Sequence, residues 1–115
     1  MVAGGCKEWC EIGEPIKNTE IFSLNTFEWK NAAELPIPLS SFQMTQFDGL
    51  PTTIGGVTIN DNSKENDLFI DVEKLYQYHY DTNQWIPHPY INLTLPRSSA
   101  AVFQVPHYYF SDCNL

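Results

Sequence analysis

Hydrophobic and polar positions alternate most regularly in the segment LYQYHYD, residues 75–81. Its three tyrosines fall on one side of a period-two pattern, and its glutamine, histidine and aspartate fall on the other. A period of two in aromatic residues predicts a β-strand. The corner DTNQ, residues 81–84, suits a tight turn, because Asp bonds its own backbone and Asn tolerates the left-handed conformation. The pattern therefore predicts a hairpin whose second strand carries Trp85.

Other short segments have the same β character. We predict strands in FQMTQF (42–47), LPTTIGGV (50–57) and SAAVFQV (99–105), and Pro follows the first and the last of these within a few residues. Only NAAEL (31–35) suggests a helical turn. The chain is therefore predicted to be all-β.

Three landmarks occur twice, in the same order, along the chain. VAGG at 2–5 returns as TIGG at 53–56, 51 residues later. The strand, polar corner and tryptophan of IFSLNTFEWK return in YQYHYDTNQWI, where Trp85 follows Trp29 by 56 residues. PLSS returns as PRSS after 58 residues. Because the offset changes only between landmarks, where loops belong, we interpret the chain as two copies of one unit of about four short strands.

Composition and charge exclude several classes of function. The 115 residues are 43% hydrophobic and 14% aromatic, which is typical of a folded domain rather than a disordered chain. The net charge of -8 repels a phosphate backbone, so no nucleic acid partner is expected. Apolar runs are far shorter than the roughly 20 residues of a membrane helix, and no membrane partner is expected. Residues 1–15 lack the basic start and apolar stretch of a secretory signal, so we expect a cytoplasmic protein.

The chain has three cysteines, Cys6, Cys10 and Cys113. An odd number does not suggest a disulfide framework, and we interpret them as reduced thiols. A zinc site made by the C-x3-C pair with His79, His88 or His107 is an alternative, although structural zinc sites use C-x2-C pairs. The sequence contains no G-x-S-x-G nucleophile elbow, no phosphate-binding glycine loop and no pair of carboxylates within a recognisable catalytic motif. We therefore expect no catalytic residues, no metal and no cofactor.

The order of a glycine pair, an aromatic-Asp corner, a tryptophan and LPRSSA resembles the kelch repeat. The second unit carries the family's markers at Gly55, Gly56, Tyr80, Asp81, Trp85 and Arg97. The first unit carries Gly4, Gly5 and Trp29. It departs from the pattern at Leu24 and Asn25, in place of Tyr and Asp, and at Leu39, in place of Arg. The resemblance covers about residues 2–110.

The resemblance implies an all-β fold, an incomplete kelch-type β-propeller of about two four-stranded antiparallel blades. We expect repeat one at about 1–49, repeat two at about 50–97 and the start of a further blade at about 98–115. Such a piece exposes sheet edges and faces, so we expect remaining blades or self-association to cover them.

Kelch-type propellers commonly bind other proteins, so the resemblance implies an interaction module and not an enzyme. It implies the substrate-recruiting part of a ubiquitin ligase adaptor or an actin-associated scaffold. A fragment of a kelch-type copper oxidase or sugar isomerase is the alternative.

The second unit is longer than the first because of residues 58–74, which lie between the expected second and third strands. This segment is rich in Asp and Glu. In a propeller this loop lies on one face with the connections between blades, here 31–41 and 86–97. We expect this face to bind a protein partner with a basic segment. The candidate residues are Asp61, Glu65, Asp67, Asp71 and Arg97. A solvated insertion without a partner remains the alternative.

Asn92 begins the sequon NLT, in a predicted loop between blades. The tripeptide also occurs often by chance, and without a secretory signal we do not expect glycosylation.

Overall fold

The structure is a computed structural model that describes residues 1–8, 13–61 and 68–110. This part of the chain forms nine strands and one 3-10 helix. They are β1 (Val2–Ala3), β2 (Thr19–Ser23), β3 (Glu28–Ala32), β4 (Gln43–Phe47), β5 (Leu50–Ile54), β6 (Val57–Ile59), β7 (Phe69–Asp71), β8 (Lys74–His79), β9 (Gln84–Asn92) and η1 (His107–Phe110).

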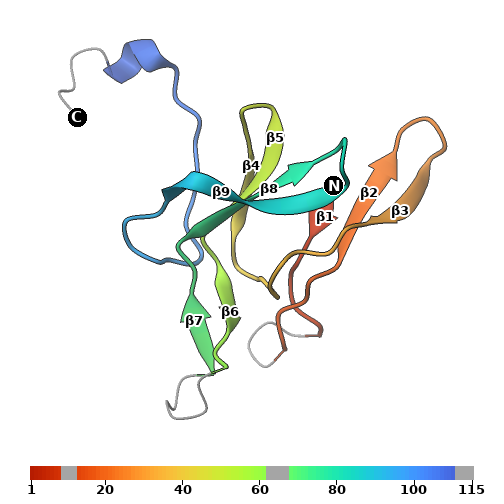
Figure 1. Cartoon of the computed structure of the whole chain (residues 1–115), viewed down its shortest axis with the longest axis horizontal. Coiled ribbons are helices and arrows are strands. Elements are labelled where there is room, and N and C mark those ends of the chain that lie inside the picture. Colours follow the sequence, from red (N-terminus) through yellow and green to blue (C-terminus); the bar gives the residue numbers. More distant parts are fainter. Residues whose placement is uncertain (9–12, 62–67, 111–115) are drawn as a thin grey trace.

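The strands form three antiparallel sheets, which confirms the all-β class. One sheet has three strands in the order β1-β2-β3, and a second has four in the order β4-β5-β8-β9. The third is a two-stranded ribbon of β6 and β7, which projects from the lower side of the molecule in Figure 1. None of these three sheets closes on itself within the described residues. The four-stranded sheet takes its first strand from residues 43–47, within the range expected for repeat one.

The hairpins β2–β3 and β8–β9 have the same register. Phe22 lies opposite Trp29 in the first hairpin, and Tyr78 lies opposite Trp85 in the second. The ring centroids of these two pairs are 5.2 and 5.3 Å apart. The residue before each second strand is in the left-handed region, with φ of 55° at residue 27 and 50° at residue 83. The two hairpins are therefore equivalent at an offset of 56 residues.

The glycine pairs are also equivalent, and their conformation requires glycine. Gly4 has φ of 60° and Gly55 has φ of 68°. A Cβ at residue 4 would lie 2.3 Å from the carbonyl oxygen of Leu39, and one at residue 55 would lie 2.4 Å from that of Arg97. The next glycine in each pair donates its N–H to the same carbonyl, at 2.9 Å in both cases. Leu39 and Arg97 therefore occupy equivalent positions through their backbones.

The core lies where the three-stranded sheet packs on one face of the four-stranded sheet. Its buried residues are Ala3, Leu35, Leu39, Val72, Tyr76, Tyr78 and Trp85. Trp85 donates its indole N–H to Oγ1 of Thr19 at 3.1 Å, between β9 and β2. Asn83 accepts the backbone N–H of Ala33 at 2.9 Å, which fixes the β8–β9 turn to the end of the first sheet.

Two secondary-structure predictions are wrong. Residues 99–105 form no strand, and a 3-10 helix follows them at His107–Phe110. Within the described residues no strand pairs with 99–105, and an extended segment needs such pairing to form a sheet. NAAEL is not a helical turn, because Asn31 and Ala32 end β3 and Pro36 disfavours the helical conformation of the residue before it.

Candidate functional site

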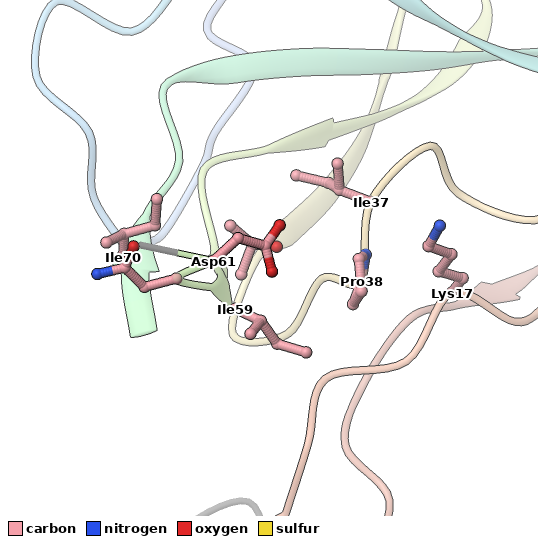
Figure 2. A pocket seen from close by; sticks show the side chains of 8 residues that line it. Lys17, Ile37, Pro38, Ile59, Asp61 and Ile70 are labelled. Carbon is pink, nitrogen blue, oxygen red and sulfur yellow. The ribbon is translucent and has the colours of Figure 1, made fainter. Parts of the chain in front are cut away.

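A pocket of about 630 Å³, which we call the main pocket, lies between the β6–β7 ribbon and the loops of the first repeat. Figure 2 labels six residues of its wall: Lys17, Ile37, Pro38, Ile59, Asp61 and Ile70. They come from three segments that are far apart in sequence. The β1–β2 connection supplies Lys17, the β3–β4 connection supplies Ile37 and Pro38, and the ribbon supplies the others.

Backbone hydrogen bonds hold the ribbon beside the β3–β4 connection. Ser40 and Val57 exchange two bonds, of 3.0 Å and 2.8 Å, so β6 begins against this connection. At the far end Asn60 donates its N–H to the carbonyl of Leu68 at 2.9 Å. Thr58 lies directly opposite Ile70 in the ribbon, and both line the pocket.

The ribbon carries exposed apolar side chains on successive positions. Leu68 is 74% exposed, and Phe69 and Ile70 are also exposed. A second, smaller hollow of about 190 Å³ is lined by Glu14, Ile59, Leu68 and Phe69. Because successive strand residues point to opposite faces, Ile70 lines the main pocket and Phe69 lines the smaller hollow. Exposed apolar side chains next to a hollow are typical of a surface that binds a partner.

The charges around this surface are mostly negative. Asp61 lines the main pocket, Glu14 lines the smaller hollow, and Asp71 is exposed at the end of β7. Lys17 supplies a positive charge on the opposite wall of the main pocket from Asp61 (Figure 2). The surface therefore combines apolar contact area with acidic groups at its rim, and we call it the ribbon surface.

The predicted partner-binding residues do not all fall on the ribbon surface. Asp61 and Asp71 do, whereas Glu65 and Asp67 lie outside the described residues. Arg97 is exposed and is not part of the pocket wall. Its Nε is 3.5 Å from the carbonyl of Leu95, and its own carbonyl accepts the N–H of the second glycine of the pair.

The repeat markers differ in exposure between the two units. Trp85 is 6% exposed, whereas the equivalent Trp29 is 54% exposed. Tyr80 is exposed and packs edge-on against Tyr78, with ring centroids 5.2 Å apart. The carboxylate of Asp81 accepts the N–H of Thr82 at 3.0 Å, as expected for a turn.

Tyr78 is buried and donates its hydroxyl to Oδ1 of Asn83 at 2.6 Å. Burial raises the pKa of Tyr78 above its ordinary value, and the neighbouring Tyr80 raises it further. Burial also raises the pKa of Tyr76. Both shifts have burial as their first cause, which agrees with the place of these two rings in the core.

The interpretation of Cys6 as a reduced thiol is wrong, because Cys6 is disulfide-bonded. Cys10 and Cys113 lie outside the described residues. A disulfide removes the thiolate that the zinc alternative needs at Cys6. Nδ1 of His88 lies 3.0 Å from the backbone N of Ile91, whose N–H it accepts. In the part of the chain that the structure describes, no three His, Cys, Asp or Glu side chains are grouped so that they could hold a metal ion.

The sequence did not indicate the pocket residues Lys17, Ile37 and Ile70. Lys17 and Ile37 come from two separate loops and Ile70 comes from β7, and no local pattern brings these segments together. The segment LPIPL at 35–39 is not a motif of any site. The one available signal was the short apolar run LFI at 68–70 inside an acidic insertion.

The described residues contain no helix of the length and apolar character that crossing a membrane requires. Neither a protein-family model nor a curated protein matches this chain.

Proposed function

We propose that this chain is a protein-interaction module that binds a peptide segment of a partner on the ribbon surface. The observation that carries this proposal is the convergence of the main pocket, the exposed run Leu68–Ile70 and the acidic rim on one ribbon. Binding on loops and short ribbons that a larger sheet positions is common in β-proteins.

The chemistry of the ribbon surface favours a basic and apolar partner. A pocket of about 630 Å³ accepts one or two large side chains, and Ile37, Ile59 and Ile70 supply apolar contacts. Asp61 lines the same pocket, where it attracts Lys or Arg next to those apolar contacts, and Asp71 adds a negative charge at the end of β7. The net charge of -8 adds long-range attraction for a basic segment.

We further propose that the module is part of a kelch-type β-propeller. The matching registers of the hairpins β2–β3 and β8–β9, and the matching glycine contacts, support two blades of one kind. The ring of Trp29 is exposed, whereas the equivalent ring of Trp85 is buried, and this difference supports a further sheet on the outer face of β2–β3. That sheet would come from remaining blades or from a second copy.

The disulfide of Cys6 bears on the roles that the resemblance implies. Ubiquitin ligase adaptors and actin scaffolds work in reducing compartments, where disulfides are rare. The proposal is therefore limited to protein recognition.

A random-peptide display library selected against the folded chain tests the proposal. We expect enriched peptides to carry Lys or Arg next to an aliphatic or aromatic residue. Asp61→Lys should weaken their binding by about fivefold or more, since a solvent-exposed ion pair is worth up to about 1 kcal/mol and reversal adds repulsion. Ile70→Ser should weaken it as well, through lost apolar contact.

Glu28→Lys makes the same charge change on β3, away from the ribbon, and should leave binding unchanged. Peptides whose binding is the same for Asp61→Lys, Ile70→Ser and the parent chain would show that the ribbon surface is not the binding site.

A further inference from the structure

Asn92 belongs to the sequon Asn92-Leu93-Thr94, the single Asn-X-Ser/Thr triplet of the sequence. The structure places it at the last residue of β9, opposite Lys74 of β8, and not in a loop as predicted. Asn92 and Thr94 are exposed, whereas Leu93 between them is partly buried.

The backbone fixes this alternation. Leu93 donates its N–H to the carbonyl of Glu73 at 2.8 Å. Its Cδ1 lies 3.5 Å from the point where a Cβ of residue 55 would stand, so this side chain is turned toward the glycine pair. Asn92 and Thr94, one position to either side, are on the solvent side. The two side chains that define a sequon are thus both accessible in the folded chain.

The disulfide of Cys6 is an independent observation about the environment of the chain. Disulfides form and persist in the secretory and extracellular compartments, and sequons are glycosylated in that same pathway. The expectation of a cytoplasmic protein came from the sequence of residues 1–15, which lacks a secretory signal, and the disulfide of Cys6 disagrees with it.

We propose that Asn92 is an N-glycosylation site of a chain that matures in an oxidising, secretory compartment. The donor class is a lipid-linked oligosaccharide pyrophosphate. Nδ2 of Asn92 forms a bond to C1 of the first sugar and loses one proton, while the bond from C1 to the pyrophosphate oxygen breaks and the lipid pyrophosphate leaves. No oxidant or reductant is consumed.

The position of Asn92 gives the glycan a physical effect. β9 is the outer strand of the four-stranded sheet and runs for nine residues, Gln84–Asn92. An exposed edge of this length can pair with a strand of another chain. Pro87 and Pro89 already remove two N–H donors from it. A glycan at Asn92 adds bulk and hydration at the end of the same edge.

Cell-free translation of the full chain, behind a cleavable secretion signal and with microsomes, tests the proposal. In the protease-protected fraction we expect a larger species that a peptide N-glycosidase converts to the mass of the bare polypeptide. Asn92→Gln and Thr94→Ala should abolish the larger species, and Thr94→Ser should retain it. Asn31→Gln, which changes an exposed asparagine of β3 outside any sequon, should have no effect.

A second measurement tests whether the Asn92→Gln chain still folds. The Asn92→Gln chain should keep its disulfide and its urea unfolding midpoint, so that a lost glycan is distinguished from misfolding. A protease-protected, disulfide-bonded parent chain that has only the mass of the polypeptide would overturn the proposal.

Discussion

The indole N–H of Trp85 donates a 3.1 Å hydrogen bond to Oγ1 of Thr19, and both residues are buried. This bond joins β9 of the second repeat to β2 of the first, across 66 positions of sequence. The three-stranded sheet therefore covers the face of the four-stranded sheet that carries Trp85. The equivalent tryptophan of the first sheet, Trp29, is 54% exposed.

Removing the acceptor of this bond should destabilise the fold. Thr19→Val keeps the shape of the side chain but leaves the buried indole N–H without its partner, which costs about 1–3 kcal/mol. Thr19→Ser retains a hydroxyl and should cost less. Urea unfolding followed by circular dichroism measures both. Equal stability of the valine variant and the parent chain would show that the bond contributes nothing.

The outer face of the first sheet should mediate self-association of the isolated chain. Phe27 is 76% exposed next to Phe22, and Trp29 completes an aromatic cluster there. We expect sedimentation velocity to show concentration-dependent assembly, and Trp29→Ser to reduce it. Leu24→Ser, at an equally exposed position in the turn, is the control. A parent chain that remains monomeric throughout a dilution series would contradict this role.

The two classes of glycine should respond differently to alanine. Gly49→Ala places a side chain at φ of 76° in open space, so only the left-handed conformation is penalised, by about 1–2 kcal/mol. Gly55→Ala has the same penalty and also a clash with the carbonyl of Arg97, which adds about 1–3 kcal/mol. Thermal unfolding of the two variants should therefore rank Gly55→Ala as the less stable. The reverse order would contradict the close approach at residue 55.

The hairpins and glycine contacts were accessible from sequence because their signals are local or repeated. The alternation of tyrosines and the corner at 81–84 determine β8, the turn and β9 within a few residues of one another. The repeated landmarks placed Trp29 and Trp85 in equivalent strands. In the structure each tryptophan lies opposite an aromatic residue at the same register of its hairpin.

The remaining features depend on contacts that no local pattern contains. β6 and β7 have three residues each, too few for a period to be recognised, so the ribbon was interpreted only as an acidic loop. Residues 99–105 have β character but no pairing strand in the described part of the chain. The pocket needs Lys17 and Ile37 from two loops and Ile70 from β7, which are far apart in sequence. The number of cysteines does not determine which of them form a disulfide.

The buried tyrosines should make the fold sensitive to alkaline pH. The pKa of Tyr78 is raised by burial and by Tyr80, so the folded chain binds the phenol proton more tightly than the unfolded chain. The stabilisation is fully present below the unfolded pKa of about 10 and is lost as pH rises through the higher folded value.

Urea midpoints measured from pH 8 to about pH 11 should therefore fall at the alkaline end. Tyr78→Phe should lose about 1 kcal/mol at pH 8, with its hydrogen bond to Asn83, but should show a smaller alkaline fall. Tyr90→Phe, at a 91% exposed position, should behave as the parent chain does. If the urea midpoint of Tyr78→Phe fell at alkaline pH as much as that of the parent chain, groups other than Tyr78 would cause the loss of stability.

The disulfide of Cys6 predicts the number of free thiols. The chain has three cysteines, so one intramolecular disulfide leaves one thiol, whereas the reduced state has three. Protein folded under air, denatured in guanidinium without reductant and titrated with a chromogenic thiol reagent should therefore give one thiol per chain. Reductant should raise this to three. Because a disulfide lowers the entropy of the unfolded chain, reduction should also lower the urea midpoint. Three thiols in the air-folded monomer would show that Cys6 is reduced and would remove the independent support for a secretory compartment.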